Sequence, residues 1–260
     1  MIIELFGPPG CGKTTFAHAL ARRLCGRGFR AKVALSYQAS NRSGPFDLGI
    51  FYFILRIASA MFSTSKILLS SKGSGNELSI SLSMVRLIPP KRRIWRARLW
   101  QYILHLSHCW DQAKQSTEII IFDQGYVQAI GSLAMFNGGS DTVALAKALS
   151  LAPEADFAVR LIVPPGVVEA RLRHRMEHEP PAERIFEADP NINMRSFGLF
   201  EIINNILVES DRKVISIAPL DDQSTFKSIS RVEQQVISML SQADGGPAAK
   251  KGAMTSARRR

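Results

Sequence analysis

A glycine-rich loop close to the start of the chain constrains the fold more than any other feature of the sequence. Residues 7–14 read Gly-Pro-Pro-Gly-Cys-Gly-Lys-Thr and match the pattern G-x-x-x-x-G-K-[ST] in full. The apolar run at residues 2–6 predicts a buried strand before the loop, and residues 13–24 have the apolar spacing of a helix. Strand, glycine loop and helix in this order predict an α/β domain with parallel strands.

The residue types in this loop are suited to hold phosphate groups. Its glycines let backbone N–H groups turn toward phosphate oxygens, and the N-terminus of the following helix adds positive potential. Lys13 has the reach for the β- and γ-phosphates of ATP, and the Thr14 hydroxyl is a ligand for Mg²⁺. The alternative interpretation is an ordinary glycine-rich turn. The predicted nucleotide contacts are Gly7, Pro8, Pro9, Gly10, Cys11, Gly12, Lys13, Thr14 and Thr15.

Asp123 is the second candidate ligand for Mg²⁺. It follows Ile-Ile-Ile-Phe at residues 119–122, which is the clearest interior strand of the chain. Ligands of open α/β folds gather at the carboxyl ends of the strands, and a carboxylate there holds Mg²⁺ directly or through water. The alternative is an aspartate that caps the turn Asp-Gln-Gly.

Strands and helices alternate along the rest of the chain. Further strands are predicted at residues 30–35, 157–163 and 213–217. Helices are predicted at residues 48–62, 91–115, 143–151, 167–177, 194–209 and 224–242. We expect a three-layer α/β fold, with a five-stranded parallel sheet covered by helices on both faces. The length of 260 residues suits a single domain, assigned to residues 1–243, followed by a disordered basic tail at residues 244–260.

The charge and cysteine content narrow the functional classes. A formal net charge of +11 suits a polyanionic ligand, but no pattern of a nucleic-acid-binding module accompanies it, so nucleic acid is not an expected partner. Three cysteines at no metal-like spacing predict neither a zinc site nor disulfides, which indicates a reducing, cytoplasmic location. Arg56 and Lys66 interrupt the most apolar stretch, residues 46–69, so no membrane-spanning segment is expected.

Two further segments resemble a known family. Residues 123–132, Asp-Gln-Gly-Tyr-Val-Gln-Ala-Ile-Gly-Ser, resemble the Asp-Arg-Tyr segment after the third strand of thymidylate kinases. Residues 161–175, Leu-Ile-Val-Pro-Pro-Gly-Val-Val-Glu-Ala-Arg-Leu-Arg-His-Arg, resemble the same family's strand, Pro-Pro turn and arginine-rich lid helix. The wider group of P-loop nucleoside and nucleotide kinases is similar in the same places.

The resemblance implies a kinase that transfers the γ-phosphoryl group of ATP to a small molecule. It places an acceptor lobe at residues 41–115 and a lid at residues 171–197. Lys13, Asp123, Arg171 and Arg175 are then the candidate catalytic residues. Arg171 and Arg175 share a helix face, where they would stabilise the charge that phosphoryl transfer develops. The alternative is a solvated helix whose arginines pair with Glu169 and Glu177. Further candidates in the lid are Arg184 and Arg195.

The chain departs from this family on the acceptor side. Gln124 stands where thymidylate kinases carry an arginine, and the second strand ends without a carboxylate, for which Asp47 is the nearest substitute. The acceptor, a nucleotide, nucleoside or sugar-like molecule, therefore stays open, as do a homodimer and the choice of ATP or GTP. In the predicted helix 91–115, arginines and tryptophans either bind the acceptor or form a solvated face and a core: Arg92, Arg93, Arg96, Arg98, Trp95 and Trp100.

A second function belongs to a different class. A nucleotide-gated binding protein or regulatory P-loop ATPase without kinase activity would explain the missing acceptor residues and the basic tail. A motor that hydrolyses ATP usually has a glutamate after the strand-end aspartate, and Gln124 occupies that position.

Overall fold

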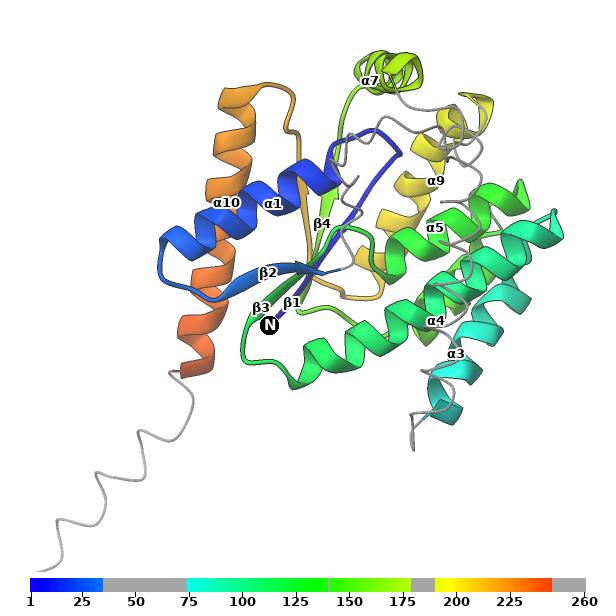
Figure 1. Cartoon of the computed structure of the whole chain (residues 1–260), viewed down its shortest axis with the longest axis horizontal. Coiled ribbons are helices and arrows are strands. Elements are labelled where there is room, and N and C mark those ends of the chain that lie inside the picture. Colours follow the sequence, from blue (N-terminus) through cyan, green and yellow to red (C-terminus); the bar gives the residue numbers. More distant parts are fainter. Residues whose placement is uncertain (35–73, 140, 179–189, 245–260) are drawn as a thin grey trace, which may run out of the picture.

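A sheet of parallel strands lies at the centre of the computed structural model, which describes residues 1–34, 74–139, 141–178 and 190–244 (Figure 1). The strands run in the order β2-β3-β1-β4-β5. Every neighbouring pair is parallel, and Ile3 of the central strand lies opposite Ile121 on one side and Phe157 on the other. The strand bounds are β1 (Ile2–Phe6), β2 (Ala31–Ala34), β3 (Ile119–Phe122), β4 (Phe157–Leu161) and β5 (Val214–Ile217). The predicted five-stranded parallel α/β fold is confirmed.

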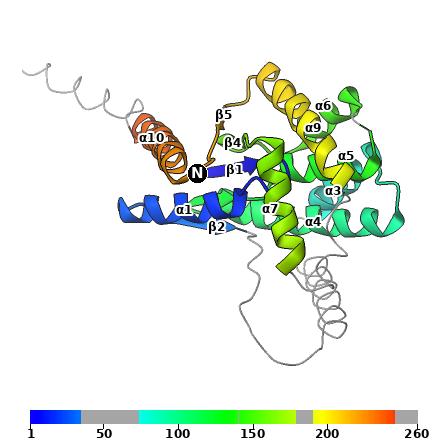
Figure 2. The ribbon, with the colours of Figure 1, turned by 90° about the horizontal axis from the view of Figure 1, so that it is seen from above.

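Helices cover both faces of this sheet (Figures 1 and 2). One face carries α1 (Lys13–Gly26) and α10 (Asp222–Asp244). The other carries α4 (Arg93–Gln115), α5 (Tyr126–Asn137) and α9 (Pro190–Glu209). Two more helices, α3 (Ser74–Leu87) and α6 (Thr142–Leu151), pack on the outside of this second layer. The remaining helix, α7 (Pro165–His178), lies beyond the carboxyl end of β4.

Two hydrophobic cores follow from the alternation of side chains along the strands. Ile3 and Leu5 of β1 face the core that α1 and α10 complete. Ile2 and Phe6 face the other core, where Trp110 of α4 is fully buried. Glu4 lies between Ile2 and Phe6, so its carboxyl group points toward the second core and is 1% exposed.

Two helices, α3 and α5, were not predicted from the sequence. The start of α3 is rich in serine and glycine, which hid the helical spacing of its buried residues Met84 and Val85. Helix α5 is buried around most of its circumference, so it has no polar face to give a helical period. The other element boundaries differ from the predicted ones by a few residues.

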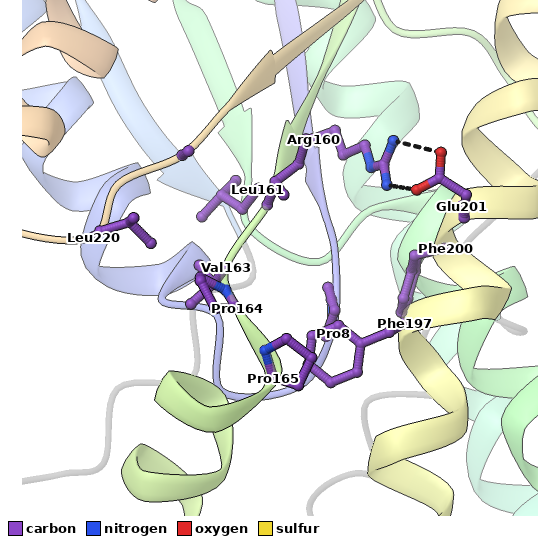
Figure 3. Close-up of a pocket in the computed structure, with 12 residues that line it drawn as sticks. Pro8, Arg160, Leu161, Val163, Pro164, Pro165, Phe197, Phe200, Glu201 and Leu220 are labelled. Carbon is purple, nitrogen blue, oxygen red and sulfur yellow. Dashed lines mark hydrogen bonds and ion pairs between the residues drawn. The ribbon is translucent and has the colours of Figure 1, made fainter.

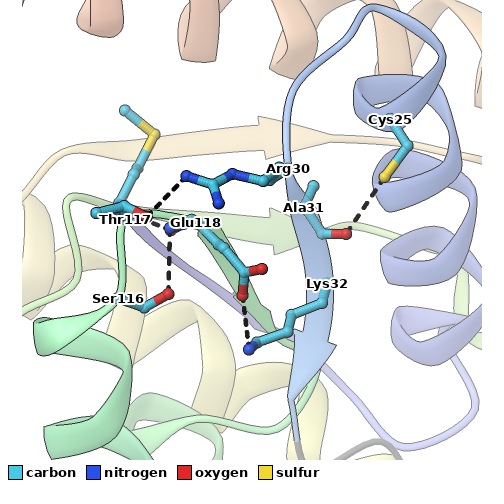
Figure 4. A network of polar contacts seen from close by, with 8 residues as sticks. Cys25, Arg30, Ala31, Lys32, Ser116, Thr117 and Glu118 are labelled. Carbon is cyan, nitrogen blue, oxygen red and sulfur yellow. Dashed lines mark hydrogen bonds and ion pairs between the residues drawn. The ribbon is translucent and has the colours of Figure 1, made fainter.

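The amino ends of β2 and β3 are joined by polar contacts near the surface (Figure 4). Lys32 pairs with Glu118 at 2.6 Å, and Arg30 donates to the Thr117 hydroxyl at 2.9 Å. The Glu118 N–H donates to Ser116 Oγ where α4 ends. Exposed ion pairs of this kind contribute little stability, so these contacts chiefly fix where β3 begins.

Several predicted features lie outside the described residues. They include the helix at 48–62, residues 41–73 of the acceptor lobe and the basic tail. The lobe, the lid and the tail therefore stay predictions. Among the residues that the structure describes, no helix has both the length and the apolar character needed to cross a membrane.

The close contact between α5 and α9 depends on Gly131, which gives a test of the packing. A Cβ atom at Gly131 would lie 2.7 Å from the ring of Phe200, which is buried. We expect Gly131→Val to lower the free energy of unfolding by about 1–3 kcal/mol through overpacking. Gly198 of α9 has open space around its Cα, so Gly198→Ala is the control and should raise stability by up to about 1 kcal/mol. Urea unfolding of both variants measures this, and equal stabilities would contradict the packing.

Candidate nucleotide-binding site

The loop between β1 and α1 has the backbone shape that its glycines predict. Gly12 is the N-cap of α1 with φ 93°, a conformation that a residue with a side chain rarely adopts. At Gly7, a Cβ atom would lie 2.8 Å from the Leu161 carbonyl oxygen of β4. Glycine at these two positions therefore lets the loop turn tightly above the carboxyl end of the central strand.

Lys13 lies within the loop and is 8% exposed. Its Nζ donates to the carbonyl oxygens of Gly7 at 2.9 Å and Pro8 at 3.0 Å, and it lies 3.7 Å from Cys11 Sγ. The ammonium group thus spans the concave side of the loop. Phosphate oxygens placed there would compete with the two carbonyls for its protons.

Thr14 and Asp123 meet at the carboxyl ends of β1 and β3. The Thr14 hydroxyl donates to Asp123 Oδ2 at 2.6 Å, across 109 positions of sequence. Asp123 is fully buried, and its Oδ1 has no hydrogen-bond partner among the described residues. An unpaired buried carboxylate oxygen beside a hydroxyl fits a hard cation or the water bound to one. These two residues would hold Mg²⁺ together with phosphate oxygens.

Helix α7 covers the loop from the other side. Arg171 Nη1 lies 3.4 Å from the Cys11 carbonyl oxygen and 3.6 Å from the position that a Cβ atom on Gly12 would take. Two residues further along, on another side of the helix, Arg173 pairs with Glu169 at 2.9 Å and stays in solvent. The two arginines therefore have different surroundings, and Arg171 alone of the pair contacts the loop.

The other predicted arginines are either exposed or have side chains outside the described residues. Arg195 is exposed on α9. The side chain of Arg175, together with Arg184 and Asp47, lies outside the described residues. Thr15 is exposed at the start of α1, whereas Cys11 is fully buried in the loop.

The segment after β3 connects three elements, and sequence reasoning did not single out its contacts. Gln128 Oε1 accepts from the Gly7 N–H at 3.2 Å, and Glu4 Oε1 accepts from the Val127 N–H at 2.5 Å. Tyr102 of α4 donates its hydroxyl to the Gln124 carbonyl oxygen. The only sequence signal was the polar residue Glu4 inside an apolar strand.

Two titratable groups beside this segment are kept neutral. Burial raises the pKa of Glu4 from 4.5 to about 8, although the Val127 hydrogen bond and the charge of Arg212 oppose the shift. Burial, with the nearby charge of Asp123, raises the pKa of Tyr102 well above its usual value. The Tyr102 hydroxyl therefore keeps its proton and remains a donor to the backbone of Gln124.

At the start of α4, the contacts of Trp95 favour a role in packing over a role in binding the acceptor. Trp95 stacks on Phe136 with ring centroids 4.0 Å apart, and the Arg98 guanidinium lies 5.4 Å from the Trp95 centroid. Arg96 Nε donates to the Pro90 carbonyl oxygen at 2.6 Å. Arg92 and Arg93 are exposed at the helix start. Trp95 thus contributes to the structure here, while the exposed arginines stay candidates for anion binding.

A cavity of about 320 Å³ lies beside the loop (Figure 3). Pro8 of the loop, the Pro164-Pro165 turn and α9 form its walls, and an ion pair between Arg160 and Glu201 lies at its edge. Its lining is mostly apolar, which suits an uncharged group better than a phosphate.

Comparisons with known proteins agree with this loop. The model of the ATPase family associated with various cellular activities (AAA) matches residues 3–44, which contain β1, the loop and α1. Among solved structures, the chain is similar to thymidylate kinase from Ehrlichia chaffeensis, with 17% identity and a TM-score of 0.43. That alignment covers 92% of this chain and 98% of the other. No match was found among curated proteins. The family model thus matches the segment that carries the glycine-rich loop, and the five-stranded parallel sheet itself is an α/β fold.

The buried carboxyl group of Glu4 predicts a pH-dependent stability. Because its pKa is higher in the folded state, the folded protein holds the proton more tightly. The stabilisation that comes from this tighter proton binding is complete below about pH 4.5 and is lost as the pH rises through about 8. Glu4→Gln is permanently neutral and keeps an acceptor for the Val127 N–H. We expect the unfolding free energy of the wild type to fall relative to Glu4→Gln between pH 5 and 9, by about 4 kcal/mol. A difference that is constant in urea unfolding across this range would contradict the shift.

Proposed function

We propose that this protein binds Mg²⁺ and ATP at the loop of residues 7–14 and transfers the γ-phosphoryl group to a small-molecule acceptor. The observation that carries the proposal is the convergence of four side chains at one sheet edge. Lys13 lies in the loop, Thr14 is bonded to Asp123, and Arg171 contacts the loop from α7. Phosphoryl transfer needs chiefly positioning and stabilisation of charge, and these groups supply both.

Each group has a distinct part in this reaction. The loop backbone and Lys13 orient the phosphates, and Arg171 stabilises the charge that develops on the transferred group. Mg²⁺, held by Thr14 and Asp123 with phosphate oxygens, would neutralise part of the same charge. Arg175 is proposed to join Arg171 from the same face of α7. The acceptor would enter from the side of α4, next to Gln124.

Acceptor-dependent ATP consumption tests the proposal. Purified protein is assayed with Mg²⁺ alone and with a panel of nucleosides, nucleoside monophosphates and phosphorylatable sugars. We expect turnover with one acceptor class, and a loss of about 10²–10³-fold in Lys13→Ala, because one charge-stabilising donor is removed. Equal turnover of the wild type and Lys13→Ala would disprove catalysis at this loop.

Arg171 and Arg173 form a matched pair for a second test. Arg171→Ala should lower kcat by about 10–100-fold, since it removes a positive group close to the transferred phosphoryl. Arg173→Ala removes the same charge from the same helix, but its partner is Glu169 in solvent, so kcat should stay within about twofold. Steady-state kinetics of both variants measures this, and equal losses would show that only the net charge of α7 matters.

A nucleotide-gated binding protein is the second candidate. The observation in its favour is the bond between the Tyr102 hydroxyl and the Gln124 backbone, which ties α4 to the residue beside Asp123. A change at the nucleotide site would reach α4 by this contact. Tight ATP binding without acceptor-dependent turnover would favour this function over the kinase.

A further inference from the structure

We infer that Gln128 is a positioning residue of the phosphate-binding loop, an inference that rests on the proposed nucleotide binding there. Gln128 is 7% exposed, and its side-chain carbonyl accepts from the N–H of Gly7, the first residue of the loop. A buried backbone N–H that loses an acceptor destabilises the conformation that needs it. Gln128 therefore fixes the point at which the loop leaves β1.

The hydrogen-bond acceptor for Gly7, the side-chain carbonyl of Gln128, belongs to a part of the molecule that is itself fixed. Gln128 lies in the first turn of α5, and the preceding Val127 N–H is bonded to Glu4 of β1. Gly125 lies so close to Glu4 that a Cβ atom there would be 2.4 Å from Oε1. The Ser132 hydroxyl donates to the Gln128 backbone carbonyl at 3.0 Å. A group held on a rigid element positions its neighbour more accurately than one on a loop.

Nucleotide binding makes this contact more important. Lys13 Nζ donates to the carbonyl oxygens of Gly7 and Pro8. Phosphate oxygens that take up the ammonium group would weaken both of these bonds. The bond from Gly7 to Gln128 lies on the opposite, N–H side of Gly7 and does not compete with phosphate. It therefore keeps the start of the loop in place while Lys13 turns to the ligand.

Cys11 provides a direct report on the position of Gly7. Its side chain is fully buried, and its Sγ lies 3.2 Å from the position that a Cβ atom on Gly7 would take. A shift of Gly7 would uncover this thiol. The other cysteines, Cys25 and Cys109, are more accessible and are replaced by serine so that only Cys11 reacts.

The test compares Gln128→Met, which keeps the length of the side chain but has no oxygen acceptor, with Ser150→Ala on α6, which removes an exposed side-chain bond to a helix carbonyl. Two quantities are measured in the cysteine-replaced protein: the rate of Cys11 modification by a thiol reagent without nucleotide, and the affinity for ATP with Mg²⁺. We expect Gln128→Met to react about tenfold faster and to bind ATP about tenfold more weakly, as for one lost buried hydrogen bond. Ser150→Ala should match the parent in both.

A third variant separates positioning from mere filling of space. Gln128→Glu keeps a carbonyl acceptor for the Gly7 N–H whether or not its carboxyl group is ionised. It should therefore restore the slow Cys11 reaction. Fast Cys11 reaction in Gln128→Glu, or slow reaction and unchanged affinity in Gln128→Met, would overturn the inference.

The two proposals fail in different ways. Absence of ATP binding by the parent protein would disprove the proposed function, whereas the Cys11 reaction reports the loop position without nucleotide. If Gln128→Met does not fold, hydrogen exchange of the wild type decides. Gly7 N–H exchange as slow as that of Leu5 in β1 supports the contact with Gln128, and fast exchange overturns it.

Discussion

Two carboxyl groups buried beside the central strand organise the carboxyl edge of the sheet. Asp123 accepts a hydrogen bond from the Thr14 hydroxyl, and Glu4 accepts one from the Val127 N–H at the start of α5. A buried carboxyl group without hydrogen bonds is costly, so each dictates where its donors lie. These two bonds hold the loop, β3 and α5 in one arrangement. Two further hydrogen bonds follow from it, one from the Gly7 N–H to Gln128 and one from the Tyr102 hydroxyl to the Gln124 carbonyl oxygen. The candidate nucleotide site thus depends on where these two buried carboxyl groups find their donors.

Local patterns predicted the parts of the fold that depend on sequence neighbours. The loop motif, the apolar strands and the Asp123 strand end are all readable from runs of adjacent residues. Helix α5 was missed because burial on all sides removes the polar face on which helical periodicity depends. The contacts of Gln128 and Tyr102 could not be read, because each joins positions that only the folded sheet brings together. Helical spacing placed Arg171 and Arg175 on one face of the helix and so set Arg173 apart, and in the structure Arg171 contacts the loop while Arg173 pairs with Glu169.

Helix α4 combines two kinds of residue that the sequence pattern alone did not separate. The aromatic spacing of α4 is explained by packing, since Trp95 lies on Phe136 and Trp110 lies against Phe122. The exposed arginines at the helix start are not needed for this packing. Positive side chains at a helix N-terminus oppose the helix dipole, so their presence is unfavourable for the helix itself. A cost of this kind is expected where a protein uses positive charge for an anionic ligand.

The position of β1 in the sheet also determines when the site forms during folding. Its neighbours are β3 and β4, so Ile3 pairs with residues 121 and 157 rather than with any nearby part of the chain. Parallel sheets built from such distant partners fold slowly, because long loops must close before the contacts form. During synthesis, the first strand emerges long before its partners exist. The glycine-rich loop after β1 therefore reaches its final shape only when β3 and β4, which lie far along the chain, have joined the sheet.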